Sequence, residues 1–155
     1  MLRGLKLLLP LLAVVAAPAR AASQEVSPPA SEWRGYCSAY VAALDGKSEV
    51  SDLDVTYCLG MTKGLLNGLR IGAQIGALSF GSRIAVRYQI DPDEVFKLFQ
   101  QQDPGRILGI CSPATSNAAD YVRAVLAHLD KTPADLQRPI GEVFFEGLQA
   151  TWPCN

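Results

Sequence analysis

Few side chains in this sequence of 155 residues have both the type and the spacing that catalysis requires. The single histidine, His128, stands between Ala127 and Leu129 near the polar side of a predicted helix, which is typical of a solvated or half-buried surface histidine. Glu142 and Glu146 are four residues apart and could form a carboxylate site, but a solvated acidic helix face explains them equally well. An enzyme needs a nucleophile with a base, a carboxylate pair or a metal. Because none of these is assembled here, the sequence indicates a protein that is not an enzyme and binds no cofactor.

The first 21 residues have the features of a secretory signal peptide. Arg3 and Lys6 precede an apolar run over residues 7–17, and Ala19-Arg20-Ala21 matches the small-x-small cleavage pattern. We expect export and cleavage after Ala21, with the next residue as the second choice. The apolar run is too short to cross a membrane as a finished helix, so we expect no membrane span after cleavage.

Cleavage would leave a flexible lead-in over residues 22–31 and a helical domain over residues 32–155. The leader contains three cations and no acids, so its removal lowers the formal net charge from −1 to −4. A mildly acidic exported domain is a poor candidate for binding nucleic acid or an anionic membrane.

The four cysteines all lie in the part of the chain that remains after cleavage. An even number of cysteines in an exported chain indicates two disulfides. A zinc site is the alternative, but the sequence contains no C-x-x-C pair and one histidine, so we expect no metal. Paired cysteines also leave no thiol for a Cys/His mechanism. The four are Cys37, Cys58, Cys111 and Cys154.

The stretch over residues 57–80 carries a glycine at every fourth position and predicts the central helix of the fold. Its polar residues, Lys63, Asn67, Arg70 and Gln74, share one narrow strip, and the remaining surface is apolar. Such a helix is expected to have neighbours on most sides, with glycine allowing another backbone to approach closely. The stripe would serve the seam of a homodimer as readily as the core of a monomer. Its members are Gly60, Gly64, Gly68, Gly72 and Gly76.

Two helix hairpins are predicted, each closed by a disulfide. A helix over residues 32–44 and the central helix would form the first hairpin, with Cys37 and Cys58 equally far from the turn. The second hairpin would turn at Thr132, midway between Cys111 and Cys154. The predicted pairs are therefore Cys37–Cys58 and Cys111–Cys154. The fold class is all-α: two disulfide-stapled helix hairpins with a less regular insertion between them.

The insertion follows Gly81-Ser82, where we expect the central helix to break. Residues 83–88 favour a short helix over a strand. Asp91-Pro92 then starts another short helix with a capping aspartate and a proline in the first turn. That helix is expected to turn four apolar side chains inward: Val95, Phe96, Leu98 and Phe99.

The C-terminal part of the chain contains a distinctive pattern. It begins with Ile110-Cys111-Ser112-Pro113, continues through a helix ending in VLAHLDKTPADLQ and closes with GLQATWPC. This pattern is similar to that of the Rap/Tai-type immunity proteins, and YCLGMTKG over residues 57–64 resembles their C-x-G-y-x-x-G segment. The resemblance covers about residues 36–154, while the stretch over 78–109 is longer than the usual connection. The C-terminal positions that match are Leu126, Leu129, Thr132, Pro133, Leu148, Trp152, Pro153 and Cys154.

The resemblance implies a small periplasmic helical protein that binds and blocks a peptidoglycan amidase toxin delivered by a type VI secretion system. Related immunity proteins are often dimers, which agrees with the possible homodimer. The alternative is a periplasmic structural or accessory binding domain that shares the scaffold and has no amidase partner.

The insertion over residues 83–106 is the expected partner-binding element, since binding residues tend to lie on loops held by a rigid scaffold. It combines charges with aromatic residues, and both aromatic residues and arginine are enriched in interface hot spots. The alternative is that the aromatic side chains pack the short helix against the scaffold. The candidate contact residues are Arg83, Arg87, Tyr88, Phe96 and Phe99.

Overall fold

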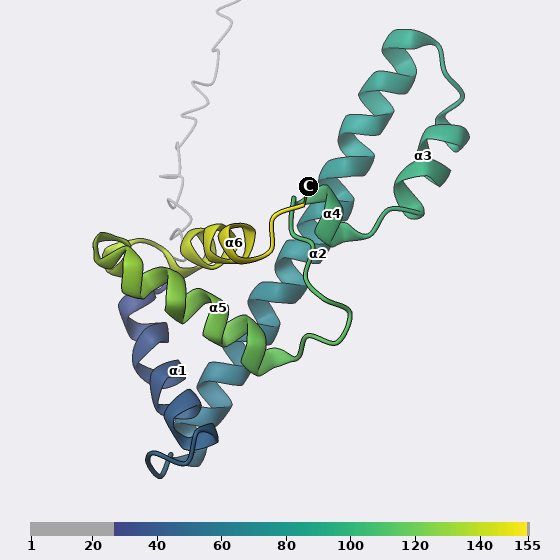
Figure 1. The fold of residues 1–155 in the computed structure, drawn as a ribbon. Coiled ribbons are helices and arrows are strands. Elements are labelled where there is room, and N and C mark those ends of the chain that lie inside the picture. The colour runs from purple at the N-terminus through teal and green to yellow at the C-terminus, as the bar shows by residue number, and fades with distance from the viewer. Residues whose placement is uncertain (1–26, 155) are drawn as a thin grey trace, which may run out of the picture.

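The computed structural model describes residues 27–154, which form six α-helices and one 3₁₀ helix (Figure 1). The all-α prediction is confirmed. The predicted signal peptide and residues 22–26 of the predicted lead-in lie outside the described residues. In chain order the elements are α1 (Ala30–Leu44), α2 (Asp52–Tyr88), α3 (Pro92–Gln100), α4 (Pro104–Ile107), α5 (Ala118–Lys131), η1 (Pro133–Gln137) and α6 (Ile140–Thr151).

The first helix begins earlier than its apolar pattern suggests. α1 starts at Ala30, and the amide of Ala30 donates a hydrogen bond of 2.9 Å to the carbonyl of Arg138. The amide of Ile140 donates one of 2.9 Å to the carbonyl of Pro28. These bonds join the end of the predicted lead-in to the start of α6, and Ala30 is fully buried. The folded part therefore begins before residue 32.

Helix α2 is the longest element, and α1, α3, α4, α5 and α6 all contact it. Ser51 caps its start by accepting a hydrogen bond of 3.1 Å from the amide of Asp54. The predicted break at Gly81-Ser82 is wrong, because the helix continues to Tyr88 and ends where Gln89 adopts a left-handed φ of 55°. A short helix over residues 83–88 was predicted, and these residues form the last part of α2.

Gly81 is a packing site for α3. A Cβ atom at this position would lie 2.6 Å from Cε2 of Phe99 and 2.8 Å from Cγ1 of Val95. The missing side chain lets α3 approach α2 closely, and Gly81 itself is buried. Phe99 and Val95 thus face inward as predicted, whereas Phe96 and Leu98 are exposed.

The prediction that the glycine stripe of α2 admits another backbone is wrong for the described residues. A Cβ atom built at any of the five glycines would meet nothing within 4 Å. The helix instead packs with the neighbouring row of residues at the same four-residue spacing, because that row carries the larger apolar side chains in the first half of the helix. The row consists of Met61, Leu65, Leu69, Ala73, Ala77, Gly81 and Ala85.

The hydrophobic core lies where α1, the first half of α2, α5 and α6 meet, and we call this part the body. Trp33 is fully buried at its centre, with its ring edge-on to that of Phe144 at a centroid distance of 6.1 Å. Its indole Nε1 donates a hydrogen bond of 3.3 Å to Oγ1 of Thr62, which satisfies both buried polar groups. Other large, fully buried side chains are Val122, Val125, Leu129, Ile140, Val143 and Leu148.

Both predicted disulfides are confirmed, and each closes one hairpin of the body. Cys37 on α1 is bonded to Cys58 on α2, with their Cα atoms 5.0 Å apart. Cys111, before α5, is bonded to Cys154, after α6, with a Cα separation of 5.1 Å. The amide of Cys111 also donates a hydrogen bond of 2.8 Å to the carbonyl of Trp152, so the second bridge is part of a short backbone pairing.

Beyond the body, α2 continues as an arm, which we define as α2 from Ile71 to its end, the following turn and α3. Figure 1 shows α3 folding back beside the distal part of α2, with α4 near the middle of that helix. The segment that the sequence presented as a less regular insertion is thus mostly helical. Among residues 27–154, no helix combines the length and the apolar run that crossing a membrane needs.

Candidate functional site

Arg138, between η1 and α6, binds the carboxylates that the sequence offered as a candidate site. Its guanidinium donates hydrogen bonds of 2.7 Å to both oxygens of Glu146, and further bonds of 3.2 Å to Glu142 and 3.1 Å to Asp135. These charge-assisted bonds hold the pKa values of Glu146 and Asp135 below their usual range. Both carboxylates are therefore already paired with an internal cation.

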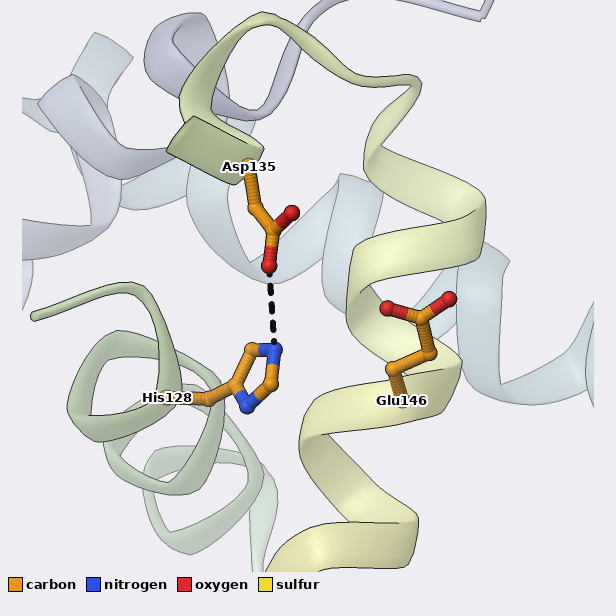
Figure 2. A group of neighbouring side chains, drawn as sticks. All are labelled: His128, Asp135 and Glu146. Carbon is orange, nitrogen blue, oxygen red and sulfur yellow. Dashed lines mark ion pairs between the residues drawn. The ribbon is translucent and has the colours of Figure 1, made fainter. Parts of the chain in front are cut away.

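His128 lies against the same cluster, and Figure 2 shows its imidazole pointing toward Asp135 on η1, with Glu146 on α6 to one side. The side chain is 17 % exposed, so the half-buried interpretation is confirmed. Its Nε2 lies 3.5 Å from Oδ2 of Asp135 and has no hydrogen-bond partner among the described residues. This contact joins the end of α5 to η1.

His128, Asp135 and Glu146 place three potential metal-ligating atoms within 4.8 Å of one another. The donor set does not suit a cation, because Arg138 already occupies both oxygens of Glu146 and one oxygen of Asp135. A metal ion would have to compete with the guanidinium for Glu146 and would lie beside its positive charge. Both disulfides are closed, so no thiol of the described residues stands beside His128 as a nucleophile. The cluster is best explained as an ion-pair network that fixes η1 between α5 and α6.

The arm holds most of the exposed apolar surface. Nine of the eleven large apolar side chains that are exposed in residues 27–154 lie between residues 71 and 98. Concentrations of this kind mark binding sites more often than isolated exposed side chains do. The nine are Ile71, Ile75, Leu78, Phe80, Val86, Tyr88, Ile90, Phe96 and Leu98.

The five candidate contact residues all lie on this arm, but they face different ways. Phe96 and Phe99 line two adjoining hollows along the seam between α2 and α3, together with Leu78. Arg83, Arg87 and Tyr88 are exposed on the last turns of α2, and the guanidinium carbon of Arg87 lies 5.9 Å from the centroid of the Tyr88 ring. The structure thus brings the two phenylalanines together and places the arginines elsewhere on the arm.

Other exposed residues of the arm were not recognised as candidates, chiefly Ile75, Phe80 and Val86. Each belongs to a helix whose surface is apolar on most sides, and such a helix is usually buried. One signal could have revealed them: the alanines and the glycine at residues 73, 77, 81 and 85 form a narrow i+4 row that suits packing against a single neighbour. The remaining faces of the distal helix would then be left in solvent.

The fold and the disulfides place the chain in the class of small, all-helical, disulfide-linked proteins. A family model described as Rap1a immunity proteins matches residues 12–154. The chain belongs to the Rap1a immunity protein family. No curated protein matches the chain. No solved structure matches it.

Proposed function

We propose that this protein binds a toxin and blocks it, and that it performs no bond-making or bond-breaking chemistry. Membership of the Rap1a immunity protein family supports the immunity role. The observation that carries the proposed binding site is the concentration of exposed apolar side chains on the arm. Burial of such side chains against a partner is favourable, at about 25 cal/mol per Å² of apolar surface removed from water.

The proposed toxin is a peptidoglycan amidase delivered by a type VI secretion system, and the proposed compartment is the periplasm. The resemblance of the C-terminal pattern to the Rap/Tai-type proteins supports this toxin class. Two disulfides suit an oxidising compartment such as the periplasm, and the predicted leader over residues 1–21 would deliver the chain there.

Inhibition would work by occlusion: the arm enters or covers the groove of the toxin, and the body holds the arm rigid. A standard interface buries about 800 Å² on each partner, which requires more surface than a single loop provides. The arm supplies two helices connected by a tight turn. We propose that its contact residues include Arg83, Arg87, Tyr88, Phe96 and Phe99.

A homodimer remains a prediction. The exposed glycine stripe of α2 leaves room for a second copy, since nothing in residues 27–154 approaches it. Light scattering of the purified domain over a range of concentrations measures this directly: a mass that stays at one chain contradicts the dimer. A dimer would not by itself distinguish an immunity protein from an accessory domain of the envelope.

The proposed function predicts that a hydrolase toxin is encoded beside the gene for this chain, and it is tested with that toxin. The purified domain, residues 22–155, is mixed with the toxin, and release of peptidoglycan fragments is measured. We expect the domain to abolish release by the toxin and to release nothing when the toxin is omitted. An unchanged rate with an excess of domain would favour the accessory role, and hydrolysis by the domain alone would refute the absence of catalysis.

A further inference from the structure

The distal part of α2 has an outer face that points away from α3. At about 100° per residue, Ala77, Gly81 and Ala85 are turned toward α3, and all three are buried. Figure 1 shows no other described element on the opposite side of this part of α2. We define the outer face by six exposed side chains on that opposite side and along its edges: Ile75, Ser79, Phe80, Arg83, Val86 and Arg87.

The outer face carries three large apolar side chains that flank its centre. Ile75, Phe80 and Val86 are 59 %, 62 % and 80 % exposed, respectively. Arg83 lies between Phe80 and Val86, three residues from each, so the guanidinium emerges from an apolar surround. Arginine and aromatic side chains are both enriched in interface hot spots.

The charges of the outer face are all positive. α2 contains no aspartate or glutamate between Val55 and Tyr88, so no acid is available on the helix to pair with Arg83 or Arg87. Neither arginine forms an ion pair anywhere in residues 27–154. Two like charges four residues apart on a helix repel each other, which disfavours the helix slightly.

The charged side chains of the body, in contrast, form ion pairs. Every ion pair among the described residues joins two residues of the body or of the turn between α1 and α2. Arg34 binds Asp130, Arg123 binds Asp45, and Arg138 binds three carboxylates. The unpaired arginines of the outer face are thus a property of the arm and not of the whole surface.

The helix dipole explains only part of this arrangement. A cation in the last turn of a helix is favourable, and Arg87 occupies that turn of α2. The effect fades beyond the last turn, so it does not reach Arg83. An arginine pair without an acid, set in an exposed apolar surface, is complementary to carboxylates on another molecule. Arginine suits this role because its planar guanidinium binds a carboxylate through two parallel hydrogen bonds.

We infer that the outer face binds an acidic protein surface, on which carboxylates pair with Arg83 and Arg87 beside an apolar recess that receives Phe80 and Val86. This inference rests on the proposed function, because the partner is the toxin. A symmetric second copy does not meet the requirement: pairing one α2 with another over this face brings together two helices that both lack acids between Val55 and Tyr88.

The test uses the toxin encoded beside the gene for this chain, made inactive by substitution of its nucleophile, and the intact mature domain. Affinity is measured at about 50 and 300 mM salt for the wild type, R83Q/R87Q, R83E/R87E and R83K/R87K. The control is K131Q on α5, which removes an exposed cation of the body that forms no ion pair in the described residues. Circular dichroism confirms that each variant folds.

We expect R83Q/R87Q to weaken binding by about 100-fold at low salt and R83E/R87E to weaken it further, since each hot-spot residue contributes a factor of about 10. The affinity of R83K/R87K for the toxin should lie between those of the other double variants and the wild type, and K131Q should bind as the wild type does. The loss in the double variants should shrink at high salt.

If all variants bind the toxin with an affinity within a factor of two of the wild type, the outer face is not the binding surface, while the proposed function stays intact. A wild type that does not bind the toxin at all would refute the proposed function itself. Two further measurements exclude other occupants. Arginine-dependent binding to phosphatidylglycerol vesicles, or self-association that is lost in R83Q/R87Q, would overturn the assignment to an acidic protein.

Discussion

Replacing Gly81 with alanine tests how the arm is held together. Gly81 lies on the buried row of α2, and a Cβ atom there would overlap Phe99 and Val95 of α3 at 2.6 to 2.9 Å. Real Cβ contacts are longer than this, so α3 must move outward to accommodate one methyl group. The body does not contact this position and should keep its structure.

Two opposing effects set the magnitude. Alanine favours the helix over glycine by about 1 kcal/mol. Overpacking a tight contact costs about 1 to 3 kcal/mol. The net expectation for Gly81→Ala is a loss of up to about 2 kcal/mol in the docking of α3, so the steric effect exceeds or cancels the helix propensity.

Gly76→Ala is the matched control. Gly76 lies on the same helix, five residues earlier, and a Cβ atom there would meet nothing within 4 Å. The substitution should therefore add the helix propensity without a clash and stabilise α2 by about 1 kcal/mol. Gly81→Ala should therefore be less stable than Gly76→Ala, although the two substitutions are chemically identical.

Amide hydrogen exchange resolved by residue is the assay, because α3 can open without global unfolding. A loss of up to about 2 kcal/mol corresponds to exchange of the α3 amides that is up to about 30-fold faster. The amides of α5 and α6 report the body and should not change. Slower exchange of α3 in Gly81→Ala, by as much as in Gly76→Ala, would refute the close approach of the two helices.

Two further predictions concern pH. Arg138 holds the pKa values of Asp135 and Glu146 down, so their contribution to stability is complete above the ordinary carboxyl pKa values and is lost as pH falls through the lowered folded values. The wild type should exceed Arg138→Gln in urea stability at pH 7, and this difference should shrink below about pH 4; a difference that stays constant with pH would contradict the network. Burial and a hydrogen bond of 2.7 Å to Glu32 raise the pKa of Tyr57 to about 12. A raised folded pKa means that this stabilisation is complete below about pH 10 and is lost as pH rises toward 12. Ultraviolet titration measures the ionisation of Tyr57 once the curve of Tyr57→Phe is subtracted. In Glu32→Gln this ionisation should move to lower pH. An unchanged ionisation of Tyr57 in that variant would exclude the hydrogen bond as a cause of the raised pKa.

The sequence predicted the body well because local spacing determines most of it. In α5, for example, Tyr121, Val122, Val125 and Leu129 recur at helical spacing, so the sequence alone indicates this helix. The last helix begins directly after Pro139, as expected because proline is unfavourable inside a helix. The disulfides follow from hairpin symmetry, since residues equally far from a turn face each other.

The arm could not be predicted in the same way. Gly81 was interpreted as a helix breaker, but in α2 it is the contact point for α3, and local sequence does not distinguish these two uses of glycine. The glycine stripe and the row packed against the body have the same four-residue spacing. Only tertiary packing decides which of two parallel rows is buried. In this structure it is the row that carries the larger apolar side chains within the body.

The most direct test of the account is whether the arm protects cells from the toxin. The toxin is directed to the periplasm of a susceptible host together with the wild-type chain, or with a variant that carries Phe80→Asp and Val86→Asp. Both residues are exposed, so the variant should fold, form both disulfides and accumulate to the same level. The account predicts survival with the wild type and lysis with the variant. Equal survival with both, at equal levels of folded protein, would show that the outer face of the arm does not bind the toxin.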